Sequence, residues 1–181
     1  MRISLKTDYA LRAMVQLAAE PPGRPIKAEH LVRMQGIPLK FLLSILSELK
    51  LAHLLSSQRG PEGGYMLRRP PSDITLADVI RAVDGPLANV HDHSLEELTY
   101  VGAAEALKDV WMAVRASLRS VLEAVTLADL ASGSLPEAVR ARTDEYRAWA
   151  ALARRTRGAE GRTRRGPSPQ PGGPGRAAPS K

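Results

Sequence analysis

The chain has 181 residues, no cysteine, and 26 Lys and Arg against 19 Asp and Glu, which gives a formal net charge of +7. Without cysteine there are no disulfides, no thiolate catalysis and no metal or iron–sulfur site built on thiolate ligands. No stretch approaches the roughly 18 apolar residues of a membrane helix, and the N-terminus lacks the apolar core of a signal peptide, so we expect a cytoplasmic protein.

The charge is distributed unevenly along the chain. Residues 1–69 carry a net charge of +6, residues 70–153 carry −6, and residues 154–181 carry +7. A basic N-terminal region suits a polyanionic partner, nucleic acid first, although a basic surface can also serve only to keep a protein in solution.

Three helices are predicted in the first 51 residues. Apolar residues at helical spacing predict a helix over 8–20, with Thr7 as its N-cap and prolines after its end. A shorter helix over 28–35 ends at Gly36, which suits a tight turn. A third helix is predicted over 39–51, directly after a proline. Two helices joined by so short a turn are typical of a helix-turn-helix.

A hairpin and a fourth helix follow. Two β-prone runs, 54–58 and 65–69, flank a loop rich in glycine and proline, which predicts a two-stranded wing. The next helix is predicted over 76–84, where Thr75 and Asp78 resemble a capping box. The fold class is therefore mainly α, with an N-terminal winged helix-turn-helix.

A long helix is predicted over 103–124, and its apolar residues recur at alternating three- and four-residue steps. Such a seam is too long for the small N-terminal domain to cover, and a partner helix from a second subunit would bury it. We therefore predict a homodimer. The predicted interface residues are Leu107, Val110, Trp111, Val114, Leu118, Val121, Leu122 and Val125.

The C-terminal part is predicted as one more helix and a tail. Ser134 and Glu137 resemble another capping box, and a helix is expected over 136–154. Residues 155–181 are rich in Gly, Pro, Arg and Ser, which predicts a disordered basic tail that could add non-specific affinity for DNA. We find no internal repeat.

Several segments together resemble the Rrf family of bacterial transcription regulators, whose members include IscR, NsrR and CymR. The matching segments are TDYALRAMVQLA, QGIPLKFLLSILSELK, SSQRGPEGGYMLRRP, ITLADVIRAVDG and VTLADL, and together they span about residues 1–131. The resemblance implies a winged helix-turn-helix joined to a long dimerisation helix. It also implies a homodimer on a palindromic operator, usually as a repressor.

With the resemblance, the chain divides into five predicted parts. They are a DNA-binding domain (1–85), a linker at the position of the family's sensor loop (86–102), a dimerisation helix (103–131), an additional C-terminal helix (132–154) and the basic tail (155–181).

The third helix is the predicted recognition helix, because the major groove of B-DNA is wide enough to admit a helix. Its predicted DNA contacts are Pro38, Leu39, Lys40, Phe41, Leu43, Ser44 and Ser47. Phe41 could instead pack on the domain and orient the helix. Leu43 stands where the family usually has a polar residue, so no operator sequence follows from the resemblance.

The wing is expected to contact DNA through Ser57, Arg59 and Gly60. An arginine at the tip of a narrow hairpin suits an A·T-rich minor groove, where the negative potential is strongest. The alternative for Arg59 is a solvated loop charge. Glu62 departs from the small or basic residue usual in the family. Candidate phosphate contacts at helix starts are Arg2, Lys6, Thr7 and Lys27.

Several relatives hold an iron–sulfur cluster through three cysteines in the loop before the dimerisation helix, and this chain has none there. We therefore predict no cofactor and no cysteine-ligated cluster. His91 and His93, together with Asp92, Glu96, Glu97 and Glu105, are weak candidates for a divalent metal, against the alternative of a solvated polar loop. A small effector near Trp111 and a protein partner on the acidic middle are equally open, although a tryptophan is more often a core residue than part of a ligand site.

Two other classes of function were weighed. An enzyme is disfavoured, because the sequence has no nucleophile–base pair, no phosphate loop and no metalloprotease motif. An interaction protein that keeps the fold without binding an operator is the second alternative, suggested by Leu43, Glu62 and the absent cysteines.

Overall fold

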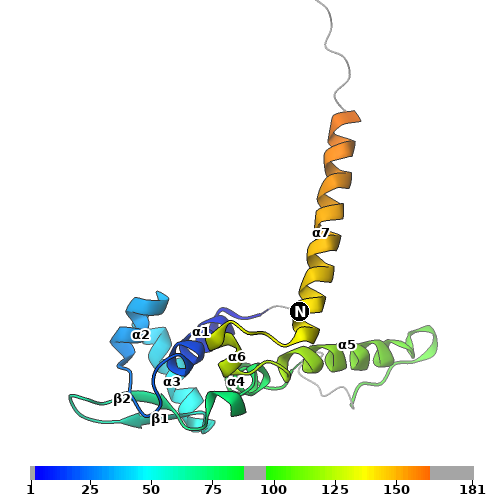
Figure 1. Cartoon of the computed structure of the whole chain (residues 1–181). Coiled ribbons are helices and arrows are strands. Elements are labelled where there is room, and N and C mark those ends of the chain that lie inside the picture. Colours follow the sequence, from blue (N-terminus) through cyan, green and yellow to red (C-terminus); the bar gives the residue numbers. More distant parts are fainter. Residues whose placement is uncertain (1–2, 88–96, 164–181) are drawn as a thin grey trace, which may run out of the picture. The chain divides into compact units, whose positions relative to one another are not determined.

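The computed structural model describes residues 3–87 and 97–163, and the chain separates into two compact units, Met1–Arg140 and Ala141–Lys181. The first unit holds α1 (Leu5–Ala18), α2 (Ala28–Gln35), α3 (Leu39–Leu51), β1 (Leu55–Gln58), β2 (Gly64–Leu67), α4 (Leu76–Asp84), α5 (Leu107–Leu122) and α6 (Leu127–Ser132). Short 3-10 turns lie at Pro71–Asp73 and Gly102–Ala104. The last helix, α7, spans Glu137–Thr163. The predicted mainly helical fold with a two-stranded wing is confirmed (Figure 1).

The hydrophobic core is built by α1, α2, α3, β1, α4 and α6, which together with the wing we call the head. Large side chains that are at most 1% exposed fill it, namely Met14, Leu31, Ile37, Leu42, Ile45, Leu46, Leu49, Leu55, Ile74, Val79 and Leu127. The predictions for the second, third and fourth helices agree with the structure, because their apolar stripes face this core.

The first helix begins three residues earlier than the sequence predicts. The hydroxyl of Ser4, and not of Thr7, accepts the capping hydrogen bond, from the Thr7 backbone N–H at 3.0 Å. Thr7 is only 2% exposed, and its hydroxyl donates to the carboxylate of Asp84 at the end of α4. The prediction was wrong because both hydroxyl residues can cap a helix, and only the packing of α1 against α4 selects between them.

The wing is anchored to the segment before α2. β1 and β2 pair in antiparallel register, with Gln58 opposite Gly64. Ile26 adds a bridge to β2: its N–H donates to the carbonyl of Tyr65 at 2.9 Å, and its carbonyl accepts from the Tyr65 N–H at 2.8 Å. A Cβ on Gly64 would lie 2.4 Å from the Ile26 carbonyl oxygen, so this close approach requires glycine.

The expectation of a dimerisation helix that continues to residue 131 is wrong. α5 ends at Leu122, and a separate helix, α6, turns back into the head, where Leu127 is fully buried. The Leu127 N–H donates to the Ile74 carbonyl at 2.9 Å, and the Leu76 N–H donates to the Val125 carbonyl at 3.0 Å. Val125 is 2% exposed and belongs to the head, although the sequence pattern placed it in the seam.

An internal repeat, which the sequence analysis missed, explains this return. The residues Thr-Leu-Ala-Asp stand at the start of both α4 and α6. Their threonines, Thr75 and Thr126, are the N-caps, and both tetrads form complete capping boxes. The two threonines lie opposite each other in an antiparallel bridge. Hydrogen bonds from the Thr126 backbone and hydroxyl lower the pKa of the Asp129 carboxyl below its usual value. The repeat is short, which is why it escaped a search for long periodicity.

The C-terminal helix is longer than predicted. α7 continues to Thr163, so residues 155–163 are helical and do not belong to a disordered tail. Residues 164–181 lie outside the described part of the chain. Among the residues that the structure describes, no helix combines the length and the apolarity that crossing a membrane requires.

Candidate DNA-binding surface

The outward face of α3 carries the residues that the sequence assigned to DNA. Lys40, Ser44 and Ser47 are exposed, and the apolar Leu43 between them is 40% exposed. Leu39 is also 40% exposed, and Pro38 at the start of the helix is exposed. The hydroxyl of Ser47 donates to the Leu43 carbonyl at 2.9 Å. The structure thus brings the predicted recognition residues together on one accessible helix face.

Phe41 packs on the domain and is also partly exposed. Its ring meets the Tyr9 ring edge to face, with centroids 6.1 Å apart, yet half of its surface stays exposed. Arg12 lies over the other ring of this pair, 5.6 Å from the centroid of Tyr9, and its guanidinium donates to the backbone carbonyl of Gln35. α1 therefore contacts the start of α3 through the Tyr9–Phe41 ring pair, a contact of about 0.5–1.5 kcal/mol, while Arg12 ties α1 to the end of α2.

The wing tip is exposed and linked to the far end of α3. Lys50 Nζ donates to the hydroxyl of Ser57 at 3.1 Å, which joins α3 to β1. Arg59 and Gly60 are exposed in the loop between the strands, and the Gly63 N–H closes its turn on the Gly60 carbonyl at 2.9 Å. The sequence analysis did not identify Tyr9, Arg12 or Lys50, because their roles depend on contacts between different helices and strands.

The predicted phosphate contacts do not all reach the surface. Thr7 is buried, as described above, and Lys6 Nζ pairs with Glu48 Oε2 at 2.7 Å and donates to the Val83 carbonyl. These two residues tie α1 to α3 and α4. Thr7 has almost no exposed surface for a phosphate contact, whereas the Lys6 side chain is 33% exposed and its assignment stays a prediction. Lys27 is exposed and makes no side-chain cap at the start of α2, while Arg2 lies outside the described residues.

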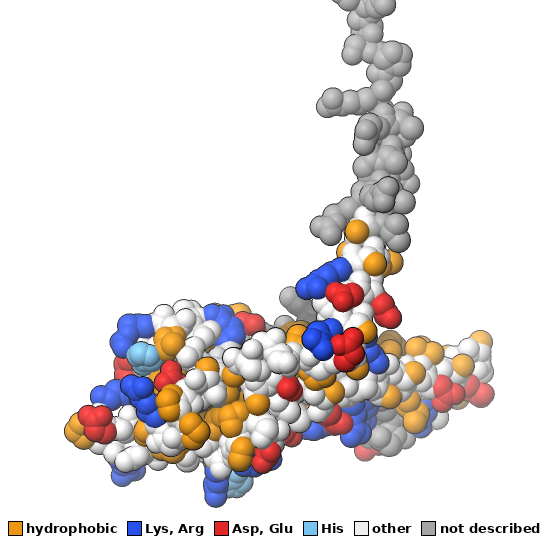
Figure 2. Space-filling view, viewed as in Figure 1, with side chains coloured by type: hydrophobic (Ala, Val, Ile, Leu, Met, Phe, Trp, Pro, Cys, Tyr) orange, Lys and Arg blue, Asp and Glu red, His pale blue; other side chains and the backbone are white. Residues whose placement is uncertain are grey.

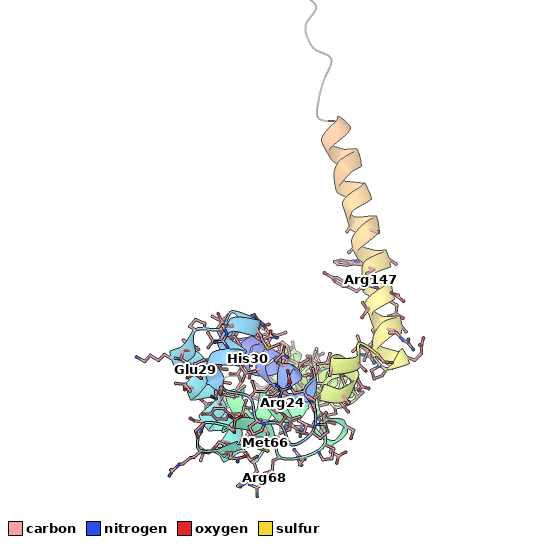
Figure 3. All side chains as sticks on the ribbon, turned by 60° about the vertical axis from the view of Figure 1, so that its left-hand side comes forward. Arg24, Glu29, His30, Met66, Arg68 and Arg147 are labelled. Carbon is pink, nitrogen blue, oxygen red and sulfur yellow. The ribbon has the colours of Figure 1, made fainter. Side chains whose placement is uncertain are left out.

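Further basic residues lie beside the wing. Arg68 follows β2, and its guanidinium is 3.0 Å from Nδ1 of His53, in the turn after α3. A hollow of about 420 Å³ separates the end of α1 from β2, with Arg24, Met66 and Arg68 among its lining residues (Figure 3). Figure 2 shows Lys and Arg side chains over the end of the head that carries α2 and the wing, with acidic side chains between them.

The apolar seam of α5 is exposed, and no residue of that helix is buried. Val110 is 51% exposed, and Leu107 and Val114 are each 38% exposed. Trp111 is half-buried, and its indole Nε1–H is buried and has no hydrogen-bond partner among the residues that the structure describes. The remaining predicted seam residues, Leu118, Val121 and Leu122, are half-buried.

The candidate metal ligands do not form a site in the described chain. His91, His93, Asp92 and Glu96 lie outside the described residues. Within residues 3–87 and 97–163, no group of three or more His, Asp and Glu side chains is arranged to hold a metal ion.

Comparison with known proteins assigns the chain to a family. The family model named Rrf2, described as an iron-dependent transcriptional regulator, matches residues 3–133. The chain belongs to the Rrf2 family. It is therefore a transcriptional regulator of a DNA-binding family and not an enzyme.

Relatives and solved structures within the Rrf2 family agree with this assignment. The protein Rv1287 of Mycobacterium tuberculosis, named as an HTH-type transcriptional regulator, is 54% identical over 148 residues, which are 82% of this chain and 92% of that protein. CymR of Bacillus subtilis is 33% identical over 73% of this chain and 91% of its own length.

The solved structure of B. subtilis CymR, the global cysteine regulator, superimposes with a TM-score of 0.63 and 32% identity over 73% of this chain and 97% of that one. T. potens IscR superimposes with a TM-score of 0.61, with 30% identity, over 74% of this chain and 88% of that one. The head of this Rrf2-family chain is thus a winged helix-turn-helix.

Proposed function

We propose that the protein is a homodimeric repressor that binds a palindromic operator in the cytoplasm of a bacterium. In this proposal α3 lies in the major groove and the wing tip reaches the adjacent minor groove. Lys40, Ser44 and Ser47 are exposed where a groove-bound helix needs polar side chains. Arg59 stands at the exposed end of a narrow hairpin, as a minor-groove contact requires.

The observation that carries the dimer is the apolar, uncovered face of α5. Three of its aliphatic residues, Leu107, Val110 and Val114, are more than a third exposed. Packing this face against the same face of a second subunit would bury these side chains and stabilise the dimer through apolar contacts.

Dimerisation would also set the specificity of binding. Two recognition helices must lie about 34–36 Å apart to enter successive major grooves on one side of the duplex. A shared α5 seam fixes that separation, so it selects half-sites by their spacing as well as by their bases.

The proposed regulator works without a cysteine-ligated cluster. The sequence holds no cysteine, so the thiolates that such a cluster needs are absent from it. Any iron dependence of the kind in the family's description would therefore have to use ligands other than thiolate.

Genome-wide mapping of bound DNA, followed by titration of the mapped site, tests the proposal. We expect an inverted repeat among the bound sites and a dimer by light scattering. We also expect an affinity for the site at least about 10³-fold higher than for a shuffled duplex of equal length. A monomer, or equal affinity for both duplexes, would contradict the proposal and favour an interaction protein that keeps the fold.

A further inference from the structure

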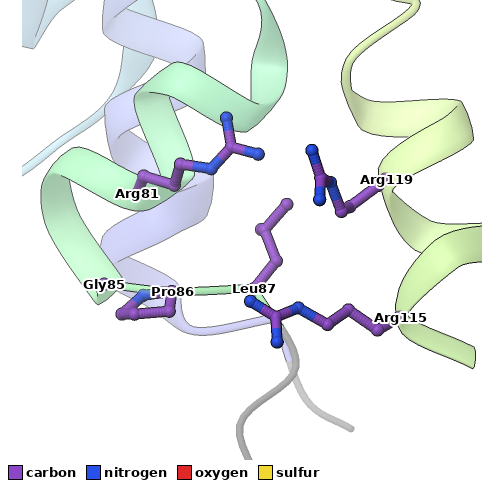
Figure 4. Close-up of a pocket in the computed structure, with 6 residues that line it drawn as sticks. All are labelled: Arg81, Gly85, Pro86, Leu87, Arg115 and Arg119. Carbon is purple, nitrogen blue, oxygen red and sulfur yellow. The ribbon is translucent and has the colours of Figure 1, made fainter. Parts of the chain in front are cut away.

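A cavity of about 310 Å³ lies between the end of α4 and the face of α5 (Figure 4). Its described lining consists of Arg81, Gly85, Pro86, Leu87, Arg115 and Arg119. The three arginines come from two helices, and Figure 4 shows their side chains reaching toward the space around Leu87. Every charged residue in this described lining is a cation.

Two of the arginines converge on one carboxylate outside the lining. Glu123 Oε1 accepts from the Arg81 guanidinium and from Arg119 Nε, the latter at 3.0 Å. These hydrogen bonds lower the pKa of Glu123, so it is ionised near neutral pH. Arg81 also lies 3.9 Å from Asp78 Oδ1, measured from Nη1. Glu123 thus pairs with two guanidinium groups near the cavity and would compete with a bound anion for them, while Arg115 adds a third guanidinium to the lining.

We propose that this cavity binds a small polyvalent oxyanion, a di- or tricarboxylate or a phosphate ester. Guanidinium groups match carboxylate and phosphate oxygens in paired, charge-assisted hydrogen bonds. Leu87 and Pro86 provide an apolar wall for a short carbon skeleton. The volume lies at the lower end of the range for small-molecule sites, which restricts the ligand to the size of a small metabolite.

Such a ligand would be a regulator, and this part of the inference rests on the proposed function. Arg81 belongs to α4 of the head, whereas Arg115 and Arg119 belong to α5. An anion bound by all three would fix the angle between the head and the dimer seam. That angle sets the distance between recognition helices, so occupancy would change operator affinity without touching DNA.

The direct test is calorimetric titration of the full chain, without DNA, at constant ionic strength. Citrate is the carboxylate probe, inorganic phosphate is the phosphate probe, and chloride is the control anion. We expect one of the two probes to bind with one site per chain, which also separates the two ligand chemistries. Failure of both probes to bind above the chloride control would overturn the proposal.

Substitutions of the lining sharpen the test. Arg119→Gln and, separately, Arg115→Gln should each weaken binding by about tenfold or more, since each removes a charge-assisted hydrogen bond. Glu123→Gln should instead strengthen binding, because it removes the carboxylate that competes for Arg81 and Arg119. The matched control is Arg147→Gln on α7, which should leave anion affinity unchanged. Far-ultraviolet circular dichroism confirms that each variant is folded.

DNA titrations separate this proposal from the proposed function. If the probe binds the protein but leaves the operator affinity unchanged, the anion site is supported and its regulatory role is overturned. If the arginine variants bind DNA less well while neither probe binds the wild type, the arginines contact DNA phosphates, and the anion site is overturned. Neither result depends on whether the protein is a repressor.

Discussion

The helices α3 and α5 have similar amphipathic patterns but opposite surroundings. In α3 the apolar stripe of Leu42, Ile45, Leu46 and Leu49 is at most 1% exposed, because α1, α2, α4 and β1 surround it. In α5 no residue is buried. The difference shows that an apolar stripe on a helix does not by itself predict which surface packs against it. The head completes one stripe within the chain, whereas we propose that a second chain covers the other.

The largest effect is expected where the stripe is covered within the chain. Leu46→Ala should lower the free energy of unfolding by about 2–5 kcal/mol, since it removes a fully buried side chain and leaves a cavity. Leu51→Ala, on the same helix but 79% exposed, should change it by less than about 0.5 kcal/mol. Urea denaturation followed by circular dichroism measures both. If both variants lose the same free energy of unfolding, the assigned difference in burial between Leu46 and Leu51 is contradicted.

The next effect tests whether a second chain covers α5. Val114→Asp should raise the dimer dissociation constant by at least about 30-fold, because it places an unpaired charge in the proposed seam. Ala116→Asp, which lies on the opposite side of α5, is the control and should leave the dimer intact. Sedimentation equilibrium measures both constants. A dimer that tolerates Val114→Asp would place its interface elsewhere.

A smaller loss is expected at the wing. Arg59→Ala should weaken operator binding by about 1–3 kcal/mol, the scale of one good contact to a base or groove. Arg59→Lys keeps the charge and should recover only part of that loss, since lysine lacks the planar guanidinium. Gel-shift titration at fixed salt measures both, with thermal unfolding as the check on folding. If Arg59→Ala binds the operator with wild-type affinity, Arg59 is a solvated loop charge and not a DNA contact.

The smallest effect concerns acid stability at the junction of α4 and α5. Because hydrogen bonds from Arg81 and Arg119 lower the pKa of Glu123, its stabilising contribution is present above the ordinary value of 4.5 and is lost as the pH falls below it. Glu123→Gln removes this contribution, so its Tm should lie below that of the wild type near neutral pH and converge with it in acid. Calorimetric scans from pH 7 to pH 3 measure the difference. A difference in Tm that stays constant across that range would show that the charge of Glu123 does not stabilise the folded protein.

Much of the head was predictable because its helices carry strong local signals. The bounds of α2, α3 and α4 follow from apolar periodicity, a glycine turn and a capping box, all of which act within a few residues. The exposed face of α3 could be predicted for the same reason, since residues that share a helix face follow from spacing alone. The contacts of Thr7 and Lys6 within the head could not be predicted, because their partners Asp84 and Glu48 are distant in sequence.

The sequence by itself determined the amphipathic helices, the wing hairpin, the basic N-terminal region and the absence of thiolate ligands. Each of these depends on residue type and on spacing within a single segment. Only the tertiary structure decided that Val125 and Leu127 return to the head, that Ile26 anchors the wing, and that three arginines of α4 and α5 surround one cavity. These features join segments that are far apart along the chain, and local patterns carry no information about which distant segments will meet.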